Sequence, residues 1–156
     1  MSPNPDLRFE VDGWAEGTSP DGHSVFVRAP DDILVARAFD IPPDLVSPLG
    51  DLPALYEHLR GPLDEAGASL LSIGALAIDG VPALEMIFEA QDESAGTIYV
   101  GALTIPFRDG SFVIKVMCRD SGSDELPLER LRDHLDRLCA TATLSERAKQ
   151  LPRFGT

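Results

Sequence analysis

The stretch that decides the fold reads LLSIGALAI-DG-VPALEMIFEA over residues 70–90 and TIYVGALTIPF-RDG-SFVIKVMC over residues 97–118. Its runs are rich in β-branched and aromatic residues, and several of them alternate in polarity, as strands with two different faces do. Asp79-Gly80 and Asp109-Gly110 are short sequences typical of hairpin turns. Residues 70–118 therefore predict antiparallel strands that follow one another in space.

Two positions in these strands carry further information. Gly101 interrupts a run of large side chains, so we expect a bulge or the close approach of another element there. Pro106 has no N–H to donate, which predicts that its end of the strand lies near a sheet edge. In the last strand, Phe112, Ile114, Val116 and Cys118 face one way, and the residues between them face the other. Both faces are largely apolar, which predicts a central position for this strand.

Residues 128–142 predict an amphipathic helix, because leucines recur at spacings of three and four. We expect Asp124 to cap it, Pro127 to occupy its first turn, and Leu131, Leu135 and Leu138 to pack against one face of the sheet. A second helix is expected from Asp51 to Gly67, with a break or kink at Gly61-Pro62.

Short strands are expected in the first forty residues, over 7–11, 25–27 and 33–36. The whole pattern predicts an α+β protein, with an antiparallel sheet of about six strands and two main helices. We assign residues 7–150 to a single domain, with tails at 1–6 and 151–156.

The charge is strongly segregated along the chain. Residues 1–100 hold 18 acidic and four basic side chains, a net charge of −14, whereas residues 101–156 hold eight acidic and nine basic ones, a net of +1. Such a negative field repels nucleic acid and anionic membrane surfaces and favours a basic protein partner. Solubility alone is the alternative explanation.

No catalytic, metal or cofactor motif is recognisable. His23, His58 and His134 have no neighbour at metal-ligand spacing, and we expect all three at the surface. Cys118 and Cys139 form no CxxC pair and are expected to be small buried hydrophobes, with a disulfide or a reactive thiol as the alternative. The sequence therefore predicts a protein that is not an enzyme and holds no cofactor.

Three residues are candidates for contact with a protein partner. Trp14 follows Gly13 between acidic neighbours and could anchor a partner, although a single tryptophan more often closes the end of a core. Asp31 and Asp32 form an acidic doublet, for which a turn between two strands is the simpler explanation.

The order of elements resembles the PsbP-like superfamily, which also contains a Ran-binding nuclear import factor and many bacterial proteins. The resemblance covers roughly residues 51–145, on the segments 78–83, 99–106 and 109–113 and the helix from Leu128. It implies an α/β/α sandwich and a role in binding proteins rather than in catalysis. A weaker similarity links the chain to bacterial secretion chaperones, which bind segments of a cargo protein.

These observations favour a non-catalytic binding or accessory module with an acidic surface. A small-molecule or lipid pocket between sheet and helix, near Met86, Phe88, Phe112 and Met117, and a chaperone-like cargo binder remain alternatives. The composition is typical of a bacterial protein, and no leader or membrane-spanning run is visible, so we expect a cytoplasmic location. A dimer stays open.

Overall fold

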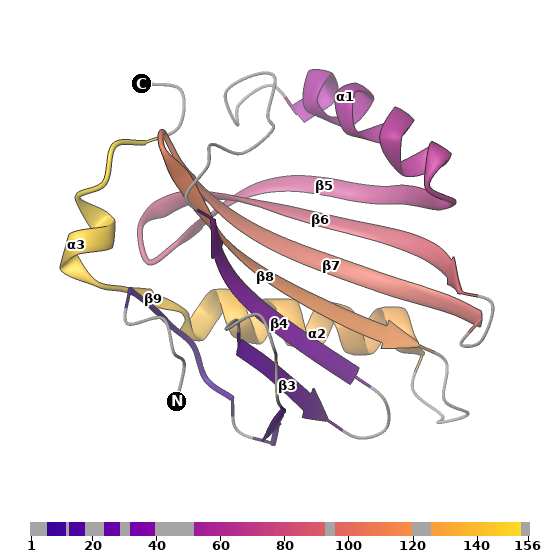
Figure 1. Ribbon diagram of the computed structural model, residues 1–156, viewed down its shortest axis with the longest axis horizontal. Coiled ribbons are helices and arrows are strands. Elements are labelled where there is room, and N and C mark those ends of the chain that lie inside the picture. The colour runs from indigo at the N-terminus through magenta and orange to yellow at the C-terminus, as the bar shows by residue number, and fades with distance from the viewer. Residues whose placement is uncertain are drawn as a thin grey trace.

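The computed structural model describes residues 6–11, 13–17, 24–28, 32–39, 52–92, 96–119 and 126–153, and Figure 1 shows how they are arranged. Seven strands form one antiparallel sheet in the order β2-β3-β4-β8-β7-β6-β5. Their bounds are β2 Ala15–Glu16, β3 Ser24–Arg28, β4 Asp32–Phe39, β5 Ala68–Ile78, β6 Val81–Asp92, β7 Gly96–Phe107 and β8 Gly110–Arg119.

Three helices and a small second sheet complete the described chain. α1 (Leu52–Glu65) packs along β5, α2 (Pro127–Thr141) crosses the sheet behind β7 and β8, and α3 (Glu146–Lys149) follows α2. β1 (Leu7–Arg8) pairs with β9 (Thr143–Leu144) and so joins the two ends of the chain. The α+β prediction is confirmed. None of the described helices is both long and apolar enough to cross a bilayer.

The hairpin between β5 and β6 forms at the predicted dipeptide. Asp79 and Gly80 both have positive φ, 50° and 79°, as a type I′ turn requires. Ile78 pairs with Val81 across this turn. The second hairpin turns one residue earlier than expected, because Phe107 pairs with Gly110 around Arg108 and Asp109.

The main core lies between the sheet and α2. β8 is the central strand of the seven, as predicted, and its inward side chains pack against Leu131, Leu135 and Leu138, which are all buried. Gly101 makes this contact possible. A Cβ atom added there would lie 2.6 Å from Cδ1 of Leu135. The predicted close approach is therefore confirmed, and its partner is a leucine of α2.

The prediction that Pro106 marks a sheet edge is wrong, because β7 lies between β8 and β6. The last pair between β6 and β7 is Leu84–Thr104, so β6 has already diverged where Pro106 would need a hydrogen-bond acceptor. A bridge between Phe107 and Arg153 occupies that side instead. A proline is thus tolerated at the end of an interior strand.

Smaller predictions have mixed outcomes. α1 continues through Pro62 to Glu65, so Gly61-Pro62 does not end it. Leu126, without a side-chain cap, precedes α2, and Pro127 stands in the first turn as expected. Asp51 and Asp124 lie outside the described residues. The expected strand at 7–11 is reduced to Leu7–Arg8.

We predict that Gly101→Ala destabilises the protein by about 1–3 kcal/mol, because the new methyl group overlaps Leu135 and the tightly packed core must shift. Gly74→Ala in β5 is the matched control, since a Cβ there meets nothing within 4 Å. Chemical denaturation measures both. Equal stability of the two variants would contradict this account of the α2 contact.

Candidate functional site

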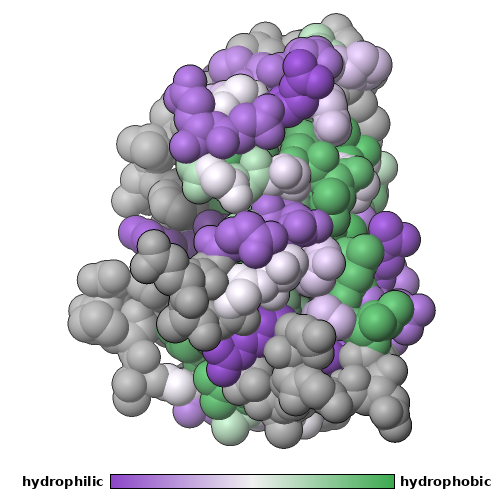
Figure 2. All heavy atoms as spheres, turned by 90° about the vertical axis from the view of Figure 1, so that its right-hand side faces the viewer, coloured by the Kyte–Doolittle hydropathy of each residue, from purple (hydrophilic) through white to green (hydrophobic). Residues whose placement is uncertain are grey.

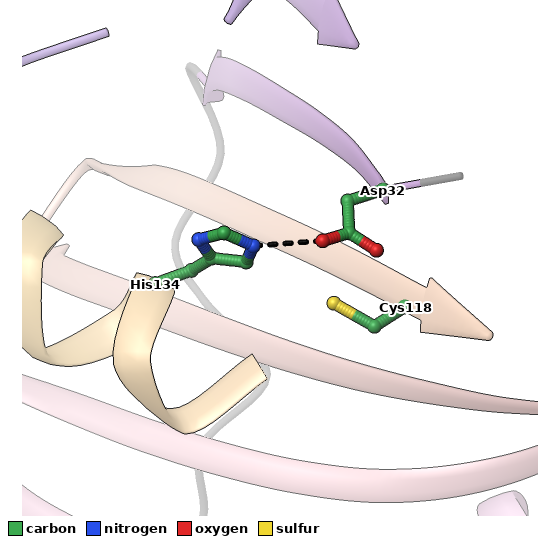
Figure 3. Close-up of side chains that lie close together, drawn as sticks. All are labelled: Asp32, Cys118 and His134. Atoms are coloured by element: carbon green, nitrogen blue, oxygen red, sulfur yellow. Dashed lines mark hydrogen bonds and ion pairs between the residues drawn. The ribbon is translucent and has the colours of Figure 1, made fainter. Parts of the chain in front are cut away.

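The most concentrated group of polar side chains in the described interior lies between α2 and one corner of the sheet. We call Asp32, Cys118, Arg130 and His134 the Asp32 cluster (Figure 3 shows three of them). Asp32 begins β4, and Cys118 lies near the end of β8, each one residue beyond the Ile33–Met117 pair. Arg130 and His134 lie one turn apart on α2, so both side chains reach the same carboxylate.

Asp32 is held by charged and polar donors on both oxygens. The Arg130 guanidinium donates through Nη2 to Oδ1 (3.1 Å) and through Nε to Oδ2 (3.3 Å). Nη2 also donates to the carbonyl of Arg119 (2.8 Å). Nε2 of His134 lies 2.8 Å from Oδ2. The Asp32 and Arg130 side chains are only 1% and 7% exposed, so this is an interior ion pair.

Two opposing effects set the pKa of Asp32. Burial alone raises it, but the hydrogen bonds from His134 and Arg130 and their positive charges outweigh burial and hold the pKa below its ordinary value. The carboxylate is therefore ionised wherever the protein is folded near neutral pH.

A metal ion fits this group poorly. Ligand atoms of Asp32, Cys118 and His134 all lie within 4.8 Å of one another, which is compact enough for a divalent cation. The Arg130 guanidinium, however, already engages both oxygens of the carboxylate. A cation bound there would have to displace Arg130 or lie next to its positive charge.

The same residues do not form a nucleophilic triad. In a Cys-His-Asp arrangement, one imidazole nitrogen contacts the carboxylate and the other contacts the thiol. Here Nε2 of His134 contacts Asp32, and the second ring nitrogen points away from Cys118 (Figure 3). Cys118 is also almost fully buried. The arrangement orders the interior and does not activate the thiol.

Cys139 is no better placed for chemistry. Burial, together with the nearby carboxylates of Glu85 and Asp136, raises the pKa of its thiol to about 11. It is therefore protonated at neutral pH. Both cysteines are free thiols, and the expectation of buried hydrophobes is confirmed for Cys118, while Cys139 is half-buried.

The three candidate protein-binding residues, Trp14, Asp31 and Asp32, do not lie together on an exposed surface of the described structure. Asp32 is interior, so it cannot present its carboxylate to a partner at the surface. Asp31 lies outside the described residues. Trp14 is half-buried against the core, and its ring meets that of His134 edge-on, with centroids 4.9 Å apart. It packs on the His134 side of the Asp32 cluster, which agrees with the simpler explanation that it closes the end of the core.

Sequence reasoning missed the roles of Arg130 and His134. The expectation that His134 is a surface histidine is wrong, because its side chain is only 13% exposed. His58 is half-buried, and His23 lies outside the described residues. The only local signal was the four-residue spacing of Arg130 and His134, which cannot identify a partner 98 to 102 residues away.

Two further aspartates from the acidic part of the chain also bind its C-terminal part. Asp6 pairs with Arg147 and accepts a hydrogen bond from Ser145 (2.7 Å). Asp79, in the first hairpin turn, accepts from the backbone N–H of Leu144 (2.9 Å) and pairs with Lys149 (3.1 Å). These interactions lower the pKa of both carboxyls.

No protein-family model matches the sequence, and no curated protein is significantly similar to it. Solved structures do match. The Ran-binding protein Mog1p of Saccharomyces cerevisiae gives a TM-score of 0.62 at 13% identity, with 92% of each chain covered. The cyanobacterial PsbP (CyanoP) of Synechocystis sp. PCC 6803 gives 0.58 at 14%, with 90% of this chain and 87% of that one covered.

The protein has a PsbP-like fold. LpqN of Mycobacterium tuberculosis, described as involved in cell envelope biogenesis, shares it with a TM-score of 0.58 at 16% identity, covering 92% of this chain and 87% of LpqN. The predicted resemblance is thereby confirmed. At these identities the PsbP-like similarity concerns the fold alone.

We predict that Asp32→Asn costs about 3–5 kcal/mol near neutral pH, because it leaves the buried guanidinium without its counter-charge. The lowered pKa makes the Asp32 contribution fully present above the unfolded value of about 3.9 and lost as the pH falls through the folded value. The stability gap between wild type and variant should therefore narrow below about pH 4.

Urea denaturation between pH 7 and pH 3 measures this gap. Asp64→Asn, at an exposed position of α1, is the control and should leave stability within about 0.5 kcal/mol of wild type. A gap for Asp32→Asn that is small at pH 7, or that stays constant down to pH 3, would contradict a stabilising role for the ion pair.

Proposed function

We propose that this PsbP-like protein is a non-catalytic binding module whose acidic surface recognises a basic protein partner. The proposal that the module is non-catalytic rests on the burial and full hydrogen bonding of the Asp32 cluster. Both oxygens of the Asp32 carboxylate accept hydrogen bonds, and the cluster is buried. Its thiol and imidazole, which could act as nucleophile and base elsewhere, therefore contribute to packing here.

The solved structures with the same fold support the general role. One is named a Ran-binding protein, and another is described as involved in cell envelope biogenesis. Those words apply to those proteins. For this chain, the shared fold supports the proposal of a binding or accessory role.

The acidic surface is most evident on α1. Glu57, Asp64 and Glu65 are exposed there, with Arg60 as the only described basic residue of the helix. α2 carries as many exposed acids, namely Glu129, Asp133 and Asp136, but Arg132 and Arg137 are exposed among them. Hydrophilic side chains dominate the top of the molecule in Figure 2, at the height of α1 in Figure 1.

Charge of this kind acts mainly on association. A negative patch steers a positive partner and raises its association rate, and this effect falls with ionic strength because the Debye length is only about 8 Å at physiological salt. A partner held by α1 should therefore dissociate as salt is raised.

We predict that the tagged protein captures a basic partner from the lysate of its own cells at low salt and releases it at high salt. A variant with Glu57→Gln, Asp64→Asn and Glu65→Gln should lose at least about tenfold in captured partner, since three favourable charges are removed. The matched control changes Glu129, Asp133 and Asp136 to their amides and alters the net charge equally.

Retention of the partner by the α2 variant and its loss by the α1 variant would support the proposal. Equal effects would show that only net charge matters, and capture that is insensitive to salt would exclude electrostatic recognition. Quantitative mass spectrometry of the eluates provides the measurement.

A second candidate function rests on an apolar row across the sheet face opposite α2. The registers align Val27, Ile33, Met117, Val100, Phe88 and Leu70 from β3 to β5. Only the β3–β4 end of this row is exposed: Val27 and Ile33 are 43% and 37% exposed, whereas Val100 and Leu70 are each 6% exposed. Lys115 and Arg37 are exposed on the same face. An apolar chain with an anionic head, such as a fatty acid, would match these side chains.

We predict for this candidate that a fluorescent fatty acid binds and that Ile33→Lys weakens binding by about tenfold, because a charge interrupts the row. Leu126→Lys is the matched control, since Leu126 is 61% exposed but stands at the start of α2. No saturable binding, or equal affinity of both variants, would rule out this ligand class. The four residues expected to line a pocket between sheet and helix do not share a face: Met86, Phe88 and Met117 lie on the face opposite α2, and Phe112 lies on the face that α2 covers.

A further inference from the structure

Among the described strands, the sheet ends in a long one whose own sequence offers little protection against pairing. β5 is the outermost of the seven strands and spans 11 residues, ASLLSIGALAI, without a charged residue or a proline. The opposite edge, β2, is only two residues long. Proteins usually protect a long edge with charge, proline or shortness, so an unprotected one is a template for another strand.

The turn geometry shows which backbone groups of β5 face outward. In a two-residue type I′ hairpin, the residues that flank the turn exchange hydrogen bonds, so Ile78–Val81 is the bonded pair. Bonded and non-bonded pairs alternate along the ladder. Ile73, Ala75 and Ala77 therefore direct their N–H and C=O groups away from β6.

One observation agrees with this assignment, and a second limits how far it extends. Pro82 is the residue opposite Ala77, and a proline fits there because that pair needs no N–H from it. Before the irregularity between Leu70 and Ser72, the carbonyl of Leu70 accepts a hydrogen bond from the Tyr56 hydroxyl of α1 (3.3 Å). α1 thus engages the edge at Leu70, and the template is the segment Ser72–Ile78, whose pairing with β6 is uninterrupted.

We propose that Ser72–Ile78 accepts an extended segment of the basic partner as an eighth strand of the sheet, a deepening that rests on the proposed function. Each outward residue offers one donor and one acceptor, as in recognition by strand addition. Ala75 and Ala77 are exposed and small, so the incoming strand meets no side-chain obstacle on that face.

Charge selects the occupant. α1 runs beside the first part of β5 (Figure 1): its Tyr56 contacts Leu70, and the exposed Glu57, Asp64 and Glu65 follow Tyr56 towards the start of β5. A segment bound at Ser72–Ile78 therefore reaches these carboxylates where it extends past Leu70. A basic or basic-apolar segment matches this border. A second copy of the chain matches it poorly, because two molecules of net charge −13 repel one another.

The test uses the full chain and a synthetic probe, an acetylated and amidated octapeptide of alternating lysine and valine. Amide hydrogen exchange by NMR should show slower exchange for Ile73, Ala75 and Ala77 when this peptide is added. The same peptide with glutamate in place of lysine should bind at least about tenfold more weakly, because of the carboxylates on α1.

Ala75→Pro removes one outward N–H and leaves the ladder to β6 intact, since proline is tolerated on the open side of an edge strand. It should weaken binding of the lysine peptide by about tenfold, whereas Ala75→Thr, which keeps the N–H, should not. Unfolding curves for both variants show whether each is folded. If Ala75→Pro does not fold, the exchange pattern of the wild type decides alone.

Protection at the three outward amides would support strand addition. Protection elsewhere, or equal binding by Ala75→Pro and Ala75→Thr, would overturn it. Dimerisation of the wild type that Ala75→Pro abolishes would assign the edge to a second copy and also overturn the proposal. If Ala75→Pro still captures a salt-sensitive partner from lysate, the proposed function stands and this inference fails.

Discussion

The ion pair between Asp32 and Arg130 is the constraint on which the arrangement of the layers depends. A carboxylate that is 1% exposed is tolerated only where donors replace its water, and Arg130 and His134 supply them from successive turns of α2. Their reach fixes how α2 is rotated and how far it is shifted along the sheet. In that position Leu131 and Leu135 meet Gly101, so the polar contact and the apolar contact specify the same placement.

The segregated charge of the sequence therefore supplies ion pairs within the fold as well as a negative surface. Asp6, Asp32 and Asp79 come from the acidic first hundred residues, and their cationic partners Arg147, Arg130 and Lys149 all come from the part of the chain that has no acidic excess. Because the acidic residues come early in the chain and the basic ones late, the C-terminal helices can form ion pairs with elements that precede them. Other acids stay at the surface, among them Asp64 and Glu65 of α1, whereas Glu57 pairs with Arg60 of the same helix (3.4 Å).

Local sequence signals predicted what local chemistry decides. The Asp79-Gly80 turn, the leucine spacing of α2 and the gap at Gly101 each depend on residues that are close in sequence or on the size of one side chain. Pro106 and His134 were misplaced for a different reason. Whether a proline needs a neighbouring strand, and whether a histidine is covered, depends on segments distant in sequence: the divergence of β6 and the position of Trp14. Periodicity carries no information about either.

The absence of a catalytic motif is also what a binding role by backbone contacts would leave behind. Strand addition uses N–H and C=O groups that every residue has, so it needs no particular side chain and produces no motif. What it does need is an edge of sufficient length, free of charge and proline, and β5 meets that requirement while α1 supplies the charge beside it. The described interior is occupied by contacts that hold α2, so the edge of the sheet is the place where we propose to look for recognition.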